Sequence, residues 1–387
     1  MLRGNSNCGM KSFLFYSKPL NVIFGGLLLF LILVSCSVTD TKEQDSNFTR
    51  IVPSQINEIG YEVTQDVTIE ETELAFDNDL YQYHNNHNSI SIYDKKHDKY
   101  IHFNYKGELI NYYDENSFYQ IPFTPTSIYY SNKKTTFLFL HQLQIGQLES
   151  DSLSQIVLSE EPSGSRYSDR NRFEVLPNGN FLLAPAVNVL SNTSYYNQIL
   201  NKDLTDVLSQ QYLFTIYDSL GHMINKFGNF PQSNFVKNPR LYINPYYFYV
   251  IKGGFMYVAF PMGKELLKFS LNGELVEKFL IDLPGFDYET KENEIGSDTM
   301  AGLGIEKNSQ DDILYFHTIL SNDENRIKHK LFRLNMRTKT LDYSEIMNGN
   351  NYMLPYIYDG QVSFLKKYIR KEEKDIYRLK LTSESNE

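Results

Sequence analysis

Arginine is scarce in this chain of 387 residues, and three of its eleven arginines fall within seven positions. Arg166, Arg170 and Arg172 form this cluster, and Arg240 precedes a later β-rich run much as Arg172 precedes its own. A guanidinium group presents a planar fork of N–H donors that suits carboxylate and phosphate groups. The four arginines are therefore candidate binding residues for an anionic ligand. The competing interpretation is that they pair with nearby acids such as Asp169 and Glu174, as surface arginines often do.

Other patterns that could do chemistry are weaker. His84 and His87 have the spacing of a metal-binding pair, but the segment HNNHN favours a turn and a metal site would need further ligands. No G-x-S-x-G motif occurs, so a hydrolase nucleophile elbow is not indicated. Paired acids such as those at 311–312 lack the glycine and terminal glutamate of a calcium loop. The sequence thus assigns no catalytic residue, no metal ligand and no cofactor.

The N-terminal region has the pattern of an export signal. Residues 22–34 are thirteen consecutive apolar positions, preceded by Lys11 and Lys18. A membrane-spanning helix needs about 20 apolar residues, so this run is too short to cross a bilayer. It is typical of the apolar region of a secretory signal, which we place at residues 1–35. Met10 is an alternative start of translation.

Cys36 closes a more specific motif. The sequence Leu-Val-Ser-Cys at 33–36 resembles the lipobox of bacterial lipoproteins, in which the cysteine takes a diacylglyceryl group and becomes residue one after cleavage. An ordinary signal with a chance cysteine is the alternative. Two or more acyl chains anchor a protein stably, because each buried CH₂ contributes about 0.8 kcal/mol. With Ser37 after the cysteine we expect the outer membrane, on its periplasmic or its outer side, and residues 36–65 as lipidated cysteine and flexible tether.

Composition excludes two classes of partner. Lys and Arg number 37 and Asp and Glu 47, which gives a formal charge of −10. Residues 1–35 hold three basic residues and no acid, so the remainder carries −13. A chain this acidic has no electrostatic footprint for nucleic acid or for an anionic membrane surface. A hydrophobic content of 41% is enough to bury a core.

An internal repeat organises the rest of the chain. Lys99–Tyr113 matches Glu265–Phe279, with Phe, Gly, Glu and Leu at corresponding positions. Phe214–Phe227 is a third copy, and Lys330–Glu345 is a looser one without glycine in its turn. Each copy predicts a strand, a tight turn and a second strand.

The most complete unit, Tyr246–Ile281, predicts a four-stranded antiparallel meander, which is the blade of a β-propeller. Its third strand recurs near residues 100, 145, 213, 266, 330 and 376, at spacings suited to blades with insertions. We therefore expect an all-β, six-bladed propeller over residues 66–387. A pair of β-sandwiches is the alternative, and the regular spacing disfavours it.

The chain ends predict how the ring closes. The last blade has strands at Pro355–Tyr358, Gln361–Tyr368 and Asp375–Leu381 and then lacks a fourth. Asp66–Glu70 precedes the first blade and belongs to none. Pairing this N-terminal strand with the last blade would close the ring and remove two exposed edges.

These features together resemble one family. The lipobox at Cys36, the Tyr- and Asn-rich meanders and the F-x-x-x-G-E-L turns at Phe103–Leu109 and Phe269–Leu275 are similar to those of TolB-like six-bladed β-propeller lipoproteins of Bacteroidota. That family is of unknown function. The resemblance implies a fold and an envelope location, and it brings no catalytic residues.

Function is expected on the face of the propeller that carries the long loops, because loops on a rigid scaffold are where ligands usually bind. We expect a non-enzymatic module that binds an unidentified small molecule, peptide or protein on that face, or scaffolds a protein there. The alternative is a metal-assisted hydrolase or lyase that uses the central channel. A channel metal needs several carboxylates or amides from the innermost strands, and the sequence offers few.

Overall fold

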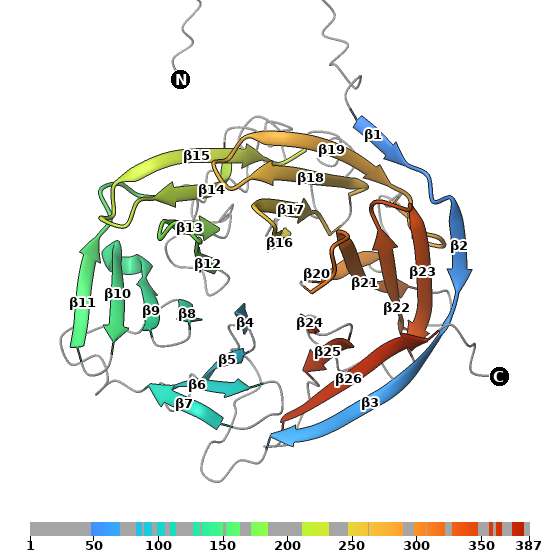
Figure 1. Cartoon of the computed structure of the whole chain (residues 1–387), viewed down its shortest axis with the longest axis horizontal. Helices are drawn as coiled ribbons and strands as arrows, with labels where there is room; N and C mark the ends of the chain where they lie inside the picture. Colours follow the sequence, from blue (N-terminus) through green and yellow to red (C-terminus); the bar gives the residue numbers. More distant parts are fainter. Residues whose placement is uncertain are drawn as a thin grey trace, which may run out of the picture. The chain divides into compact units, whose positions relative to one another are not determined.

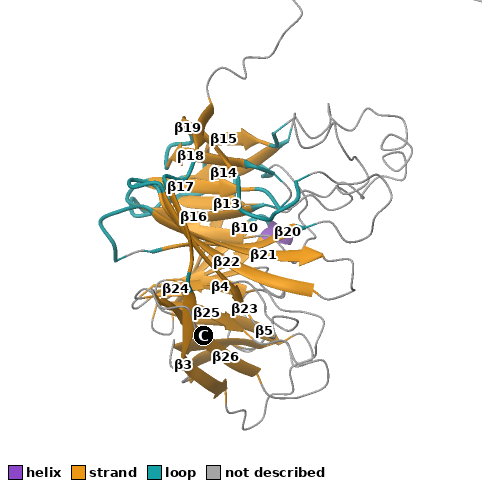
Figure 2. Cartoon of the chain, turned by 90° about the vertical axis from the view of Figure 1, so that its right-hand side faces the viewer, coloured by secondary structure: helices purple, strands orange, loops and turns teal. Residues whose placement is uncertain are grey.

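The computed structural model describes a set of segments between residues 48 and 382. They are residues 48–69, 83–86, 89–94, 99–104, 109–113, 127–131, 134–149, 152–162, 172–184, 211–231, 247–261, 263–288, 298–306, 308–321, 327–346, 356–358, 361–365 and 374–382. The described elements are β-strands, apart from one short 3-10 helix at Leu140–Gln142 (Figure 2). The all-β class expected from the sequence is therefore confirmed.

The strands form six sheets in the described residues, numbered here in chain order. Sheet 1 contains β4 (Tyr83–Asn86), β5 (Ser89–Asp94), β6 (Lys99–Asn104) and β7 (Leu109–Tyr113). Sheet 2 contains β8 (Ser127–Ser131), β9 (Lys134–Phe139), β10 (Gln144–Glu149) and β11 (Ser152–Val157). Sheet 3 contains β12 (Arg172–Val175), β13 (Phe181–Ala184), β14 (Tyr212–Tyr217) and β15 (Met223–Asn229).

The remaining sheets each include a strand from the N-terminal region. Sheet 4 contains β16 (Phe248–Lys252), β17 (Phe255–Ala259), β18 (Glu265–Ser270), β19 (Leu275–Ile281) and β1 (Phe48–Ile51). Sheet 5 contains β20 (Thr299–Ile305), β21 (Ile313–Ser321), β22 (Ile327–Asn335), β23 (Thr340–Ile346) and β2 (Gln55–Glu58). Sheet 6 contains β24 (Tyr356–Tyr358), β25 (Gln361–Leu365), β26 (Lys374–Thr382) and β3 (Gly60–Ile69). The six expected third strands are β6, β10, β14, β18, β22 and β26.

The core lies between successive sheets (Figure 1). Tyr113 of sheet 1 packs edge-on against Phe137 of sheet 2, with ring centroids 5.1 Å apart. Larger apolar clusters join sheets 2 and 3, sheets 3 and 4, and sheets 4 and 5. First strands of neighbouring sheets also touch, β4 with β8, β8 with β12, β16 with β20, and β20 with β24. Both faces of an inner sheet are therefore buried, which is why strands such as β13 and β17 are apolar at almost every position.

The N-terminal strands run along the outer edges of sheets 4, 5 and 6. β1 pairs in parallel with β19, β2 pairs in parallel with β23, and β3 pairs antiparallel with β26. We call residues 48–59, which carry β1 and β2, the strap. The expected pairing of Asp66–Glu70 with the last sheet is present, with Val67 opposite Ile376, although the strand starts earlier, at Gly60.

The strap and the start of β3 correct the expectation of a flexible tether for residues 48–65, whereas residues 36–47 lie outside the described residues. Ile51 is buried in the core of sheets 4 and 5, and Arg50 forms an ion pair of 2.7 Å with Asp282. In β2, Asn57 donates a hydrogen bond of 2.7 Å to Asp342. Sequence inspection missed these strands because each has only four residues, and their stability comes from edges supplied by distant parts of the chain.

One turn departs from the glycine pattern of the repeat. Gly221 and Gly273 adopt positive φ in the β14–β15 and β18–β19 turns, and a Cβ at Gly273 would lie 2.6 Å from Phe227. The β22–β23 turn instead has Lys339 at φ 59°. The Lys339 carbonyl accepts a hydrogen bond of 2.9 Å from the Ser54 N–H of the strap. The looser fourth copy therefore keeps a positive-φ residue in its turn without glycine, but its turn is one residue longer, because Lys339 N–H donates to the Asn335 carbonyl four positions earlier whereas Gly221 and Gly273 donate to carbonyls three positions earlier.

A pair of histidines is buried in sheet 5. His317 and His329 stack with ring centroids 5.1 Å apart, and Nε2 of His317 lies 2.9 Å from Nδ1 of His329. Burial, with the charge of His329 as the second cause, lowers the pKa of His317 to about 3. Burial also lowers the pKa of His329. The folded protein therefore holds this pair neutral at physiological pH.

The strap predicts a difference between two adjacent positions. Ile51→Ala should lower the free energy of unfolding by about 2–4 kcal/mol, because the side chain is only 2% exposed and its removal leaves a cavity. Val52→Ala should change it by less than about 0.5 kcal/mol, because Val52 is 63% exposed. Urea unfolding of both variants measures this. Equal stabilities would mean that residues 48–52 do not contribute to the fold.

The buried histidines predict acid sensitivity. In the unfolded chain a histidine has a pKa near 6.5, so the unfolded state takes up protons first as the pH falls. Between pH 7 and pH 5 the free energy of unfolding should fall by about 2 kcal/mol on account of His317 alone. His317→Leu should remove this part of the pH dependence, whether the substitution raises or lowers the free energy of unfolding at pH 7. Denaturant titrations across this range measure it, and parallel curves for the two proteins would contradict the prediction.

Candidate functional site

The first strand of sheet 3 positions the candidate arginine. Side chains alternate along a strand, so Arg172 and Glu174 share one face of β12, and Phe173 and Val175 share the other. Phe173 packs into the core with sheet 2, where its ring lies 6.2 Å from that of Tyr129. Arg172 and Glu174 consequently face β16 of sheet 4. Arg172 is the first residue of β12 and lies at the end opposite the tight β12–β13 turn.

Two buried tyrosines stand opposite Arg172. Tyr247 directly precedes β16 and Tyr249 is its second residue, and the ring of Phe214 packs edge-on against both at 5.3 Å and 5.4 Å. The Tyr247 hydroxyl donates a hydrogen bond to the carbonyl of Leu213. Burial raises the pKa of the Tyr247 hydroxyl, and the positive charge of Arg172 opposes that rise. The guanidinium is therefore close enough to act electrostatically on a phenol that it does not pair with.

Glu174 connects the same group to sheet 2. Burial raises the pKa of Tyr249, the charge of Glu174 raises it further, and the charge of Arg172 lowers it. Burial and the charge of Glu174 likewise raise the pKa of Tyr129 in β8. The first strands of three successive sheets thus contribute to one group of polar side chains. We call it the inner-strand cluster, and it consists of Tyr129, Arg172, Glu174, Tyr247 and Tyr249.

The chemistry of this cluster favours binding. The tyrosines stay protonated at any physiological pH, so they contribute neutral phenol groups beside Arg172 and Glu174. Arg172 adds a permanent positive charge with several N–H donors. In the part of the chain that the structure describes, no three His, Cys, Asp or Glu side chains come together as metal ligands. The cluster can therefore hold an anionic or hydroxyl-rich group.

Of the four arginines singled out from the sequence, Arg172 lies in the described residues. Arg166, Arg170 and Arg240 fall outside them, as do Cys36 and His87. The alternative in which these arginines pair with nearby acids such as Asp169 and Glu174 stays open, because Asp169 also lies outside the described residues.

Sequence inspection missed the two tyrosines as site residues. Tyrosine is frequent throughout the chain, with 30 copies, so a Tyr bias was interpreted as strand composition. The sequence nevertheless contained a signal for these residues in the alternation of side chains along a strand. Tyr247 and Tyr249 are two residues apart at the start of an innermost strand, as are Arg172 and Glu174, and such pairs point to the same side of a strand.

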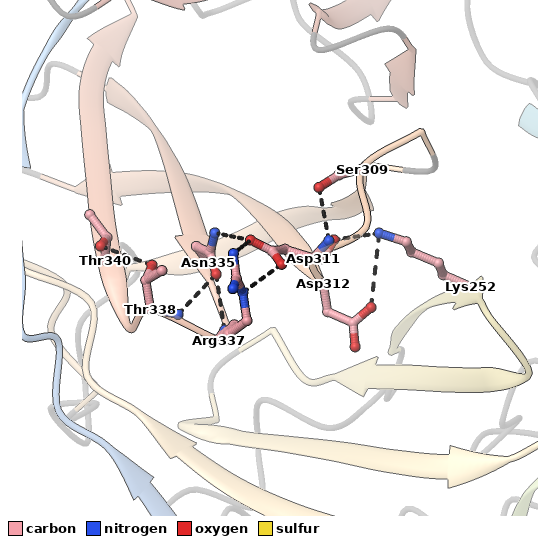
Figure 3. Close-up of polar contacts among 8 residues, drawn as sticks. All are labelled: Lys252, Ser309, Asp311, Asp312, Asn335, Arg337, Thr338 and Thr340. Atoms are coloured by element: carbon pink, nitrogen blue, oxygen red, sulfur yellow. Dashed lines mark hydrogen bonds and ion pairs between the residues drawn. The ribbon is translucent and has the colours of Figure 1, made fainter.

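A second group of charged residues lies at the tight turns of sheets 4 and 5 (Figure 3). Asp311 accepts hydrogen bonds from Arg337 at 2.9 Å and from Asn335 at 3.0 Å. The Arg337 guanidinium lowers the pKa of the Asp311 carboxyl, with Asn335 as the next cause. Lys252 donates to the carbonyl oxygen of Asp311. This turn cluster therefore ties the β16–β17, β20–β21 and β22–β23 turns together.

Asp312 is the centre of the other half of the turn cluster. Lys252 and Lys268 lie 3.9 Å and 3.6 Å from its carboxylate, and the Tyr257 hydroxyl donates a hydrogen bond to it. Lys268 also lies 4.3 Å from the ring centre of Phe255. Each charge in this group faces an opposite charge or an aromatic ring, so the arrangement fits a clamp between two sheets better than a ligand site.

The turn cluster predicts unequal effects for adjacent aspartates. Asp312→Ala should lower the free energy of unfolding by about 1–3 kcal/mol, because it leaves the Tyr257 hydroxyl without its acceptor and the largely buried Lys252 and Lys268 without this opposite charge. Asp311→Ala should cost less, because its main partner Arg337 has a side chain that is 75% exposed. Thermal and urea unfolding compare the two. A larger loss for Asp311→Ala would contradict the clamp.

Comparison with known proteins bears on the fold. No protein-family model matches the chain, and no curated protein matches its sequence. A member of the DUF4221 family from Bacteroides vulgatus is similar in structure, with a TM-score of 0.55 and 8% identity, over 84% of this chain and 99% of that one. A candidate exported protein of Bacteroides fragilis has a TM-score of 0.51 and 11% identity, over 86% of this chain and 100% of that one.

At such low identity these likenesses show the fold alone. The chain is an all-β protein with a propeller-like set of antiparallel sheets built on four strands each, a fold that it shares with these two Bacteroides proteins. In the described part of the chain, no helix has the length and apolar character needed to cross a membrane.

Proposed function

We propose that this chain is a cell-envelope lipoprotein whose propeller binds a ligand without catalysing a reaction. The observation that carries the binding role is the inner-strand cluster, in which Arg172 faces two buried tyrosines at the start of β12 and β16. A half-buried arginine with neutral phenols around it suits a ligand that carries a carboxylate or phosphate together with hydroxyl groups.

The position of the cluster supports the same role. Arg172 and Tyr247 lie where their strands begin, at the end away from the tight turns of sheets 3 and 4. The long connections of the chain enter at that end, and Arg166, Arg170 and Arg240 belong to them. In this proposal these arginines assist Arg172 in holding the anion. A local basic group is required, because a net charge of −10 repels an anion at a distance.

The architecture proposed is a closed ring of six blades, similar to TolB-like lipoproteins. The pairing of β3 with β26 supports closure, because it joins the N-terminal strand to the last sheet. Contacts between the first strands of successive sheets support the order of the blades. Anchoring is proposed on Cys36 in the outer membrane, supported by the lipobox and by the structural likeness to a candidate exported protein.

The binding role is tested by screening the purified protein against sugar acids, hydroxy acids and phosphorylated sugars by thermal shift. For a compound that raises the melting temperature, Arg172→Gln should weaken the affinity about tenfold to a hundredfold, because a charge-assisted hydrogen bond is lost. Lys226→Gln is the matched control, since it removes one positive charge from a half-buried site on β15. Equal affinities in the two variants would contradict the proposal, as would a tightly held stoichiometric metal in the purified protein.

The anchor is tested separately. Cys36→Ala should abolish incorporation of labelled palmitate and leave a precursor that retains its signal. Equal labelling of the wild type and the variant would show that the acyl chain is elsewhere or that the signal is of another kind.

A further inference from the structure

The strap exposes apolar side chains to solvent. Val52 is 63% exposed and Ile56 is 51% exposed, although the neighbouring Ile51 is fully buried. Leu275 and Val276 are also exposed, in the half of β19 that precedes its pairing with β1. Single exposed apolar residues are common on any protein and need no explanation. The strap and its neighbouring strand β19 carry four such residues, and a docking surface needs a second observation that identifies its partner.

The chain that leads into the strap supplies that observation. Eleven residues, 37–47, separate Cys36 from Phe48. Fully extended they span about 40 Å, and as a flexible coil their root-mean-square length is about 20 Å. If Cys36 carries the lipid, as proposed above, the part of the domain that the anchor holds nearest to the bilayer is the strap at β1.

Local charge fits a lipid surface as well. Arg50 of the strap and Lys264 share one carboxylate, that of Asp282, each at 2.7 Å. The Arg50 side chain is 68% exposed and lies two residues before Val52, so its guanidinium is available to a lipid phosphate in addition to Asp282. Apolar side chains of the size of Val52 and Ile56 insert at the level of the headgroups.

We propose that the strap is a membrane-contact surface, in which Val52 and Ile56 rest on the lipid bilayer and Arg50 faces lipid phosphates. The order of strands in sheet 4 is β1-β19-β18-β17-β16. Adjacent strands are about 4.8 Å apart, so β16 lies about 20 Å from β1 across the sheet. Tyr247 and Tyr249 are thus at the edge of sheet 4 farthest from β1, so contact between the strap and the bilayer leaves the inner strands away from the lipid.

The test uses the lipidated protein in liposomes that contain phosphatidylethanolamine and headgroup-quenching lipids. Single cysteines are introduced at exposed positions and labelled with a fluorophore, since acylation of Cys36 leaves the mature chain without a free thiol. Val52→Cys and Val157→Cys form one matched pair, because both valines are 63% exposed and Val157 lies on sheet 2. Ile56→Cys and Ile224→Cys form another, at 51% and 54% exposure, with Ile224 on sheet 3. Positions this exposed tolerate substitution, so folding is not at issue.

We expect quenching at positions 52 and 56 to be at least threefold stronger than at positions 157 and 224. Flotation with the liposomes and equal quenching at all four positions would overturn the contact surface and leave the lipid anchor intact. Failure of the protein to float with the liposomes would overturn the anchor, and the contact surface with it. Stronger quenching at 157 and 224 would show that the opposite sheets face the bilayer.

Discussion

Pairing between chain ends that are far apart in sequence is the constraint on which the structure depends. β3 completes the last sheet by pairing with β26, about 310 positions later in the chain, and the strap adds further strands to the two sheets before it. Without these contacts three sheets would present unpaired backbone groups along their outer edges. The N-terminal region is therefore part of the fold from Phe48 onward, and the last sheet forms only when both ends of the chain are present.

The interior combines apolar packing with two kinds of polar contact. Between sheets 3 and 4, aromatic rings such as Phe214, Phe227 and Phe269 fill the space and contact one another at 5.2–6.4 Å. At the tight turns, Asp311 and Asp312 form ion pairs with lysine and arginine side chains of neighbouring hairpins. The inner-strand cluster differs from this turn cluster in composition, because it combines Arg172 and Glu174 with three buried tyrosines. That difference separates a candidate binding site from a structural clamp.

The outer and inner edges of the sheets have different roles. The outer edges are used for pairing with the N-terminal strands, and in our proposal for contact with the bilayer. The inner strands β8, β12 and β16 bring arginine, glutamate and tyrosine together from three sheets. In our proposals the anchor is at one edge of the sheets and the ligand site is at the other.

The sequence by itself determined the strand pattern. Alternating apolar residues and glycine turns are local properties, so the repeat predicted the third strand of each sheet, including the weak copy at Gln144–Glu149. It also predicted that Asp66–Glu70 would pair with the last sheet, because a strand without a blade and a blade without a strand complement each other. The rarity of arginine in this chain singled out Arg172, whose role in binding stays a prediction.

Tertiary structure decided what depends on distant neighbours. The strap was expected to be a flexible tether because four-residue strands have little propensity of their own, and only the edges of β19 and β23 make them strands. The buried histidines and the tyrosines of the inner-strand cluster are ordinary strand residues by composition. Their altered pKa values arise from burial and from charges on other strands, and no local pattern encodes those surroundings.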